Sequence, residues 1–271
     1  MAQRPAVLVI AGADSSGGAG LARDVRTLEA MGADALCALT AVTAQTDARV
    51  LGVHPVPAEH VRLQIEAAFA SRTIGAVKIG MLAGRETVEA VADALQSAPA
   101  VPVVLDPVLR ASSGGVLLDD CGCERLRARL LPLTSLLTPN LPEAAWLTGS
   151  AAEPDPDAAR IIGWAQRLFA DGARAVLIKG GHGAGRDATD VLVRPGVEPL
   201  WLSGLRLAAS RRGTGCALAS AIAAALAAGA GLPQACRSGR AHVRALLEEV
   251  GASAVGAPPG SPGRTRHGRG Q

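Results

Sequence analysis

Short apolar runs alternate along the chain with longer stretches in which apolar residues recur at helical spacing. The apolar runs, which predict strands, cover residues 7–11, 35–42, 74–79, 101–105, 135–137 and 175–178. The stretches that predict helices cover 18–31, 58–70, 85–97, a segment beginning at Pro142, 157–171, 214–229 and 233–249. Two further runs, 189–193 and 199–203, are spaced like a hairpin. This alternation predicts an α/β fold with a mostly parallel sheet and helices on both faces.

A ligand is expected beyond the carboxyl ends of these strands, because open α/β sheets bind ligands at that edge. The informative loops are those that follow Ala11, Val42, Ile79, Leu105, Leu137 and Ile178, together with the segment that opens the 214–229 helix. Polar or glycine-rich residues in these loops are therefore the first candidates for a site.

The composition indicates an aliphatic core and a weakly charged body. Of the 271 residues, 49% are apolar and 2% aromatic, with no tyrosine, so stacking on nucleic-acid bases has almost nothing to work with. The net charge is +3, and three arginines lie in a tail that has no acidic residues, so the rest of the chain is close to neutral. No basic patch therefore indicates binding to nucleic acid or to an anionic membrane. We expect one domain over residues 1–250 and a disordered Gly/Pro/Arg tail over 251–271.

Five scattered cysteines, an odd number, favour a reducing, cytoplasmic setting over a disulfide framework. Cys121-Gly-Cys123 has no second CxxC or HxxxH near it, so zinc is not expected there. No signal peptide is evident, and the most apolar stretch, 217–232, is too short and too weakly apolar to span a bilayer.

Common nucleotide and hydrolase motifs are missing. The two lysines, Lys78 and Lys179, are followed by Ile79 and Gly180, so neither completes a Walker loop. The chain also lacks GxGxxG, GxSxG and HExxH, which argues against a dinucleotide fold, a hydrolase elbow and a zinc helix.

Gly213-Thr214-Gly215-Cys216 stands immediately before an alanine-rich helix. Glycines let backbone N–H groups turn toward one point, and the helix start adds partial positive charge, so this segment suits an anion hole. A thiol in the first turn is expected to have a lowered pKa, which would let Cys216 take a proton from a phosphoryl acceptor. A glycine loop that caps a helix with a buried cysteine explains the motif equally well.

A second glycine-rich segment, Gly12-Ala13-Asp14-Ser15-Ser16-Gly17-Gly18-Ala19-Gly20, links the first strand to the first helix. It permits close approach of the backbone to a ligand, and Asp14 and the serines can hydrogen-bond polar atoms of a substrate. The alternative is an ordinary turn with a helix cap. Its glycines exceed what a turn requires, which favours a ligand role.

Acidic and amide side chains follow two later strands. Asp106 ends one strand, and Asn140 and Glu143 lie where the next gives way to a helix. They can face one edge of the sheet, and Mg²⁺ on phosphates typically takes one or two carboxylates plus waters. Glu143 is also explained as an acid in a first helical turn, where the helix dipole favours it.

Lysine is rare enough here to be informative. Lys179 ends a strand before two glycines, which suits a phosphate, and the nearby His182 is either a loop residue or a catalyst. Lys78 is expected inside the domain, paired with an acid. Met81 is expected as a core residue or as a soft pocket wall.

In order along the chain, seven segments resemble the hydroxymethylpyrimidine/phosphomethylpyrimidine kinase family of the ribokinase-like superfamily: GADSSGGAG, TAVTAQ, KIGML, DPV, TPNLPEA, KGGH and GTGC. They run in register from about residue 7 to 250. The resemblance implies a three-layer α/β/α sandwich and a thiamine-pathway enzyme. That enzyme uses MgATP to phosphorylate the hydroxymethyl group of 4-amino-5-hydroxymethyl-2-methylpyrimidine, and then the resulting monophosphate.

The resemblance also implies roles for individual residues. Gln45 would hydrogen-bond the aminopyrimidine, and the rest of that pocket would comprise Gly12, Asp24, Met81 and Val108. Lys179 and Asn140 would contact ATP and its phosphates, and Asp106 and Glu143 would serve Mg²⁺. The anion hole at the catalytic centre would be formed by Gly213, Thr214, Gly215 and Cys216.

Two places depart from the family's pattern. Arg211-Arg212 stands where the family usually reads Thr-His, and Ser112 stands where it often has Lys, both near the expected phosphates. The chain thus gains two cations, Arg211 and Arg212, and lacks the one that the family often has at position 112. These changes either preserve the charge balance near the phosphates or mean that the second phosphorylation is altered or lost. Pyridoxal kinase is an alternative, because its substrate also carries a hydroxymethyl group on a planar heteroaromatic ring. A pyrimidine-binding sensor without transfer activity is another. We expect a homodimer that binds a small molecule and neither nucleic acid nor a membrane.

Overall fold

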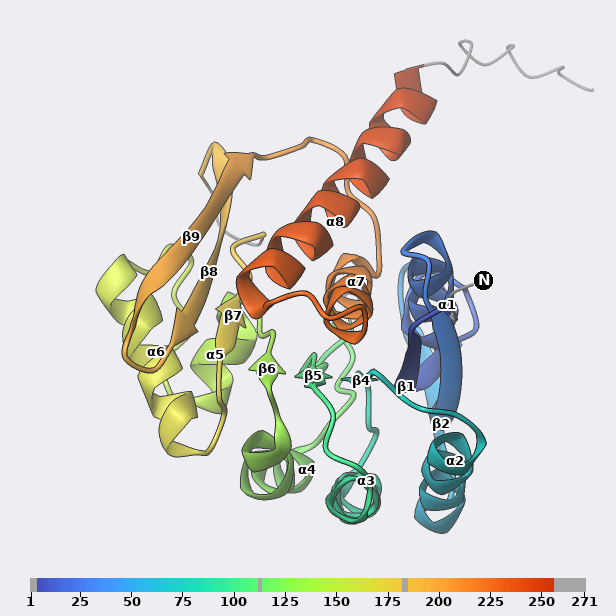
Figure 1. Cartoon of the computed structure of the whole chain (residues 1–271). Coiled ribbons are helices and arrows are strands. Elements are labelled where there is room, and N and C mark those ends of the chain that lie inside the picture. Colours follow the sequence, from blue (N-terminus) through green and yellow to red (C-terminus); the bar gives the residue numbers. More distant parts are fainter. Residues whose placement is uncertain (1–3, 112–113, 182–184, 256–271) are drawn as a thin grey trace, which may run out of the picture.

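A single sheet organises the chain (Figure 1). The computed structural model describes residues 4–111, 114–181 and 185–255. Within these ranges nine strands pair in the order β3-β2-β1-β4-β5-β6-β7-β8-β9. Their bounds are β1 (Ala6–Asp14), β2 (Asp34–Gln45), β3 (Val50–Pro55), β4 (Ala76–Ile79), β5 (Val103–Leu105), β6 (Leu136–Leu137), β7 (Val176–Ile178), β8 (Asp187–Arg194) and β9 (Val197–Leu205).

The pairing directions locate the functional edge of the sheet. Strands β2, β1, β4, β5, β6 and β7 run parallel, whereas β3, β8 and β9 pair antiparallel at the two sides. The strand order reverses at β1, which has β2 on one side and β4 on the other. In open α/β sheets such a reversal leaves a crevice at the carboxyl ends of the strands. The glycine-rich loop after β1 lies at this point.

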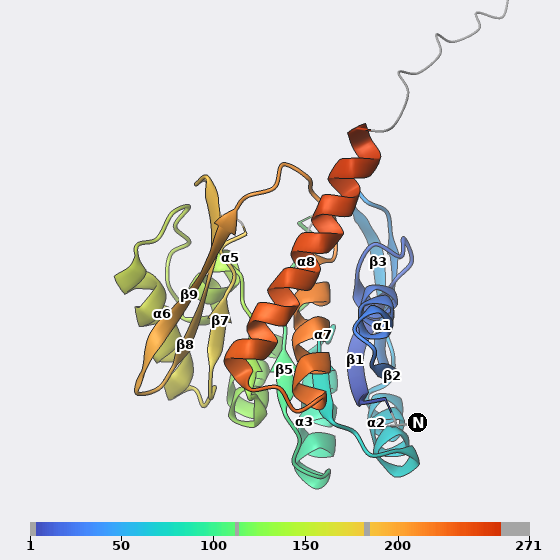
Figure 2. The same ribbon diagram turned by 45° about the horizontal axis from the view of Figure 1, so that its top comes forward.

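The helices form one layer on each face of the sheet (Figures 1 and 2). One layer contains α1 (Gly20–Ala30), α7 (Thr214–Ala227) and α8 (Leu232–Val255), with α8 packed along α7. The opposite layer contains α2 (Ala58–Ser71), α3 (Arg85–Ser97), α4 (Asp120–Arg125), α5 (Leu141–Leu147) and α6 (Ala158–Ala170). A π-helical turn (Leu126–Leu130) and a 3-10 turn (Leu131–Leu133) continue α4. The predicted three-layer α/β/α fold is confirmed.

Strand β1 shows how the sequence builds both cores. Leu8 and Ile10 point into the apolar cluster under α2 and α3, and Val7 and Val9 point into the cluster under α7. All four are fully buried, as expected for a parallel strand covered on both faces. Small alanine side chains fill the face of α7, so this helix lies close to the middle of the sheet.

All eight predicted strands and all seven predicted helices are present. The sequence analysis missed β3, because its side chains are mostly exposed and only its pairing with β2 defines it. It also missed the helical segment 120–133. Helix α8 ends at Val255 rather than at 249, so it enters the predicted tail. The rest of that tail lies outside the described residues. Among the residues described, no helix combines the length and apolarity that crossing a bilayer requires.

Candidate active site

The loops after β5, β6 and β7 bring a lysine and two carboxylates together at the carboxyl edge of the sheet. Lys179 follows β7, and its Nζ donates a hydrogen bond to Oδ1 of Asp106 at 2.7 Å. Glu143 lies in the first turn of α5, with its Oε2 3.9 Å from the same Nζ. The side chains of Lys179, Asp106 and Glu143 are 13%, 4% and 13% exposed. The cluster is therefore mostly desolvated, yet it still reaches the surface.

The start of α7 lies directly against this cluster. A Cβ atom on Gly215 would stand 3.2 Å from Nζ of Lys179 and 3.4 Å from Oδ2 of Asp106. Gly213 is the N-cap of the helix with φ +77°, and a Cβ there would stand 2.4 Å from the carbonyl oxygen of Gly18. Glycine is thus required at position 213, whereas a side chain at position 215 would press on Lys179 and Asp106. Unpaired N–H groups at the helix start and the Lys179 ammonium can meet one anion.

Mutual charges control protonation in the cluster. Burial alone would lower the pKa of Lys179, but the carboxylates of Asp106 and Glu143 raise it, so the ammonium stays charged. Burial and the negative charge of Asp106 raise the pKa of Glu143, whereas the positive charge of Lys179 lowers it. The net effect is a pKa of about 7. Glu143 is therefore the member whose charge changes near neutral pH.

Asn140 and Glu143 also cap α5. The backbone N–H of Glu143 donates to Oδ1 of Asn140, and the backbone N–H of Asn140 donates to Oε2 of Glu143, both at 2.8 Å. This reciprocal capping box agrees with the helix-start interpretation of Glu143. The cap engages only Oε2 of Glu143, so the structural role and a ligand role are compatible.

The other lysine forms a sealed pair below the site. Nζ of Lys78 donates to Oδ2 of Asp24 at 2.7 Å, and Ser220 donates to Oδ1 of Asp24 at 2.8 Å. Both charged side chains have no exposed surface. The expectation that Lys78 pairs with an acid inside the domain is confirmed. The substrate contact expected for Asp24 does not fit, because its carboxylate is enclosed and committed to Lys78 and Ser220.

A small, largely buried apolar cluster forms a wall beside the carboxyl ends of β1 and β4. Met81, which follows β4, packs with Ala41 and Leu117, and Val108 packs against this group. A Cβ on Gly12 would stand 2.9 Å from the sulfur of Met81, so glycine at this position lets the methionine approach the backbone of β1. The structure therefore brings together Gly12, Met81 and Val108, three of the expected substrate residues.

Gln45 ends β2 at the rim of this wall and is half-buried. Oγ of Ser15 accepts from the backbone N–H of Gln45 at 2.9 Å and lies 3.1 Å from its carbonyl oxygen. The side-chain Oε1 accepts from Thr43 at 3.2 Å. The backbone of Gln45 is thus tied to the glycine-rich loop.

Asp14 holds the glycine-rich loop in shape. Its carboxylate accepts hydrogen bonds from the backbone N–H groups of Ser16 and Ala19 at 2.9 and 3.0 Å, and from Arg212 at 3.1 Å. Its side chain is 5% exposed. In the structure Asp14 therefore positions the loop, and the substrate contact expected for it stays a prediction.

Cys216 lies in the first turn of α7 and is half-buried. Burial raises the pKa of its thiol to about 11, since the opposing charge of Lys78 does not offset desolvation together with Asp24 and Asp106. The lowered pKa expected from the helix start is therefore wrong for this structure. A pKa of about 11 favours the protonated thiol at neutral pH, so it gives no support to a thiolate base, and the catalytic role expected for Cys216 stays a prediction.

A model of the family described as phosphomethylpyrimidine kinase matches residues 14–259 of the chain. The chain belongs to this family. A hydroxymethylpyrimidine/phosphomethylpyrimidine kinase of Streptomyces coelicolor is 43% identical over 244 residues, which cover 90% of this chain and 88% of the relative. A relative of the same name from Rhizobium meliloti is 40% identical, with 92% of each chain covered.

Solved structures agree with this assignment. A phosphomethylpyrimidine kinase of Clostridium difficile superposes with a TM-score of 0.77 at 33% identity, covering 90% of this chain and 100% of that one. A pyridoxal kinase of Staphylococcus aureus in complex with pyridoxal gives a TM-score of 0.82 at 28% identity, covering 91% and 89%. The predicted family, the ribokinase-like fold and the kinase class are thereby confirmed.

Some features of this kinase escaped the sequence analysis. Ser220 and Asp47 were not singled out, although Ser220 hydrogen-bonds Asp24 and Asp47 pairs with Arg212. Their partners lie more than 160 positions away in the sequence, so no local pattern indicates them. Ser112 and His182 lie outside the described residues.

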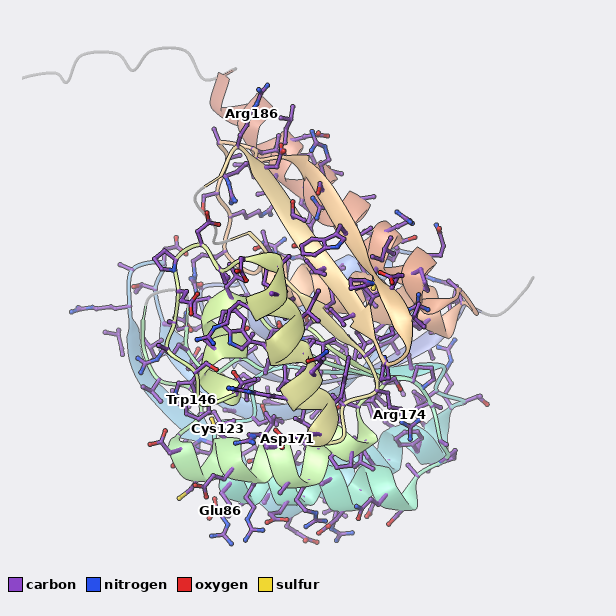
Figure 3. All side chains as sticks on the ribbon, turned by 90° about the vertical axis from the view of Figure 1, so that its left-hand side faces the viewer. Glu86, Cys123, Trp146, Asp171, Arg174 and Arg186 are labelled. Atoms are coloured by element: carbon purple, nitrogen blue, oxygen red, sulfur yellow. The ribbon has the colours of Figure 1, made fainter. Side chains whose placement is uncertain are left out.

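The paired cysteines of this kinase are not a metal site in the described ranges. Cys123 is fully buried in the core of the helical layer, where Figure 3 labels it, whereas Cys121 is exposed. No group of three or more His, Cys, Asp or Glu side chains within the described ranges could hold a metal ion. The expectation that zinc does not bind there stays a prediction.

Proposed function

We propose that this kinase transfers the γ-phosphoryl group of ATP to the hydroxymethyl oxygen of 4-amino-5-hydroxymethyl-2-methylpyrimidine, and then to the monophosphate so formed. One observation carries the proposal: the Gly215 backbone, at the start of α7, stands against the Lys179–Asp106 pair. Backbone N–H groups and a fixed ammonium around one point suit the charge that spreads over a transferring phosphoryl group. The relatives named for this activity share about 40% of their residues with the chain over nearly its full length.

In each step an oxygen of the acceptor forms a bond to the γ-phosphorus while the bond to the β–γ bridging oxygen breaks, and ADP leaves with that electron pair. The acceptor is a hydroxyl group in the first step, whose proton passes to solvent water as the new bond forms, and a phosphate oxygen in the second. Because the transition state is loose, positioning and electrostatics supply most of the catalysis. The protonated thiol of Cys216 is therefore assigned to the wall of the site rather than to proton removal.

Asp106 and Glu143 fit a magnesium ion that shares its coordination with phosphates. Mg²⁺ in such sites takes one or two carboxylates and completes its shell with substrate oxygens and water. The described residues offer these two carboxylates at the cluster and no larger group, which matches that donor set. When bound, the ion would neutralise phosphate charge, while Lys179 and Asn140 contact ATP.

The pyrimidine would occupy the crevice between the loops after β1, β2 and β4. The wall formed by Gly12, Met81 and Val108 offers an apolar surface to a flat ring. Gln45 at the rim carries a donor and an acceptor on one planar amide, which suits a ring nitrogen and an adjacent exocyclic amine. The intact Asp106–Glu143–Lys179 cluster argues against a sensor without transfer activity.

Steady-state kinetics with three acceptors test the proposal: hydroxymethylpyrimidine, its monophosphate and pyridoxal. We expect the pyrimidines to be phosphorylated with the higher kcat/KM. Gln45→Ala should weaken pyrimidine binding by about 2–4 kcal/mol, the usual cost of losing a buried polar partner, and leave the KM for ATP nearly unchanged. Gln166→Ala, on the exposed face of α6, is the matched control.

A higher kcat/KM for pyridoxal would overturn the substrate assignment in favour of pyridoxal kinase. Equal effects of Gln45→Ala on both KM values would remove Gln45 from the pyrimidine pocket. A homodimeric state and a cytoplasmic location stay predictions, and sedimentation and fractionation of the expressed protein test them.

A further inference from the structure

Arg212 joins three segments of the site through one guanidinium group. Its NH1 group donates to the Ser16 hydroxyl at 2.9 Å, to the Thr46 carbonyl at 3.3 Å and to the Asp47 carboxylate at 3.0 Å. Its NH2 group donates to Asp14 at 3.1 Å. The side chain is only 16% exposed, so these bonds form in a partly desolvated place.

The partners of Arg212 lie on the two sides of the proposed pyrimidine pocket. Asp14 ends β1 and Ser16 lies in the glycine-rich loop that follows, whereas Thr46 and Asp47 directly follow Gln45. Arg212 itself directly precedes Gly213, the N-cap of α7. One side chain therefore fixes the pyrimidine-binding segments relative to the proposed phosphate hole.

The charge of Arg212 is already balanced. Asp14 and Asp47 each form an ion pair with it, at 3.1 and 3.0 Å. By its position in the sequence, this arginine is a cation gained near the expected phosphates. Its geometry instead directs the guanidinium toward two carboxylates of neighbouring loops. The planar guanidinium group of an arginine holds several N–H donors in fixed directions, so it can bond both carboxylates at once better than the ammonium group of a lysine can.

We propose that Arg212 is a positioning residue that sets the alignment between the acceptor pocket and the phosphate-binding start of α7, and so governs transfer to the pyrimidine. This rests on the proposed function. Phosphoryl transfer depends on in-line placement, and a misplacement of about 1 Å can cost on the order of 100-fold in rate. Arg212 acts through the loops it holds and needs no contact with either substrate.

Kinetics of Arg212→Gln, Arg212→Lys and Asp47→Asn test the assignment. We expect Arg212→Gln to lower kcat/KM for hydroxymethylpyrimidine about 10- to 100-fold while the KM for ATP changes less than about threefold. Arg212→Lys should fall between this variant and the parent. Asp47→Asn should cost only about two- to threefold, because Asp47 is 88% exposed and exposed ion pairs contribute little.

The double variant Arg212→Gln/Asp47→Asn should be no worse than Arg212→Gln alone, because the second change removes a partner that is already lost. Arg129→Gln is the matched control, since Arg129 also pairs with two carboxylates, Glu89 and Asp93, in the opposite helical layer. Multiplying effects in the double variant would overturn the proposal. So would an Arg212→Gln protein that melts earlier but keeps its kcat/KM.

Hydrogen exchange in the substrate-free protein separates this proposal from the proposed function. Arg212→Gln should speed exchange of the backbone amides of Ser16 and Ala19, which the Asp14 carboxylate now holds. A parent that fails to phosphorylate the pyrimidine would defeat the proposed function and leave this readout intact. Unchanged exchange at both amides would defeat the positioning role, whatever the activity.

Discussion

The two lysines of the chain form the same ion pair in two different settings. Lys78 in β4 and Lys179 after β7 each bond an aspartate at 2.7 Å. The Lys78–Asp24 pair has no exposed surface, whereas the Lys179–Asp106 pair is 13% and 4% exposed. Identical chemistry at parallel strand ends thus yields one enclosed pair and one that a ligand can reach.

Glycines control the difference between the two pairs. A Cβ on Gly80 would stand 2.7 Å from Nζ of Lys78, so the backbone closes over that ammonium. Gly215 approaches Lys179 from the start of a helix, which presents N–H groups to the same point. Access and adjoining N–H donors, rather than the ion pair itself, therefore distinguish a phosphate site. Substitutions in each pair test this difference.

The largest effect is expected from Lys78→Met, which leaves Asp24 buried and unpaired. Although burial alone would lower the pKa of Lys78, the charge of Asp24 raises it, whereas burial raises the pKa of Asp24 against the opposing charge of Lys78. Loss of one partner of such a pair costs about 3–5 kcal/mol of stability. Urea unfolding should measure this loss. Lys78→Met/Asp24→Asn should recover part of it, and a single variant as stable as the parent would contradict the enclosed pair.

Lys179→Met should act on activity instead. Removing one fixed charge that faces a transferring group typically lowers kcat about 10²–10³-fold. The unfolding free energy should fall less than in Lys78→Met, because Glu143, with a pKa of about 7, can take up a proton and relieve the uncompensated charge. Coupled ATP-consumption assays and urea unfolding of both variants check that Lys179→Met loses mainly activity and Lys78→Met mainly stability. Near-parental kcat in Lys179→Met would remove Lys179 from the phosphate site.

Glu143 makes the accessible pair sensitive to pH. Its pKa is raised from 4.5 to about 7, so below that pH the folded protein holds a proton that competes with Mg²⁺. The Mg²⁺ concentration for half-maximal rate should rise about fivefold between pH 7 and pH 6 in the parent. It should stay flat in Glu143→Gln. The same dependence in both proteins would assign Glu143 to helix capping alone.

The same shift has a consequence for stability. Between pH 4.5 and about 7 the folded state binds the Glu143 proton that the unfolded chain has released. The contribution of Glu143 to the unfolding free energy is therefore full below pH 4.5 and is lost as the pH rises through 7. The unfolding free energy of Glu143→Gln should lack this pH dependence. The difference in unfolding free energy between parent and variant should therefore fall as the pH rises from 4.5 to about 7.

The smallest effect is expected at Cys216, which lies within electrostatic reach of Lys78, Asp24 and Asp106. A thiolate base would make Cys216→Ser lose about 10²-fold or more in kcat. Because the pKa of this thiol is about 11, we expect a loss of less than about fivefold. Its alkylation rate should keep rising with pH up to pH 10, with Cys216→Ser as the background. A 10²-fold loss of kcat in Cys216→Ser would instead support Cys216 as the general base.

The sequence predicts the accessible cluster for a physical reason. Asp106, Glu143 and Lys179 follow strands that the alternating pattern makes parallel, and parallel strands end at one edge. The same reasoning fails for Asp24, since an acid on an amphipathic helix looks identical whether it faces solvent or a buried lysine. It fails for Arg212 as well, because ion pairs that span 165 residues leave no periodic trace.

We propose above that the protein phosphorylates hydroxymethylpyrimidine twice at the Lys179–Asp106 site. The direct test incubates that alcohol with excess MgATP and counts ADP and products by chromatography. We expect two ADP per pyrimidine, with the diphosphate as end product, and both steps slowed about 10²–10³-fold in Lys179→Met. No ADP above the pyrimidine-free background, or both steps intact in Lys179→Met, would contradict it.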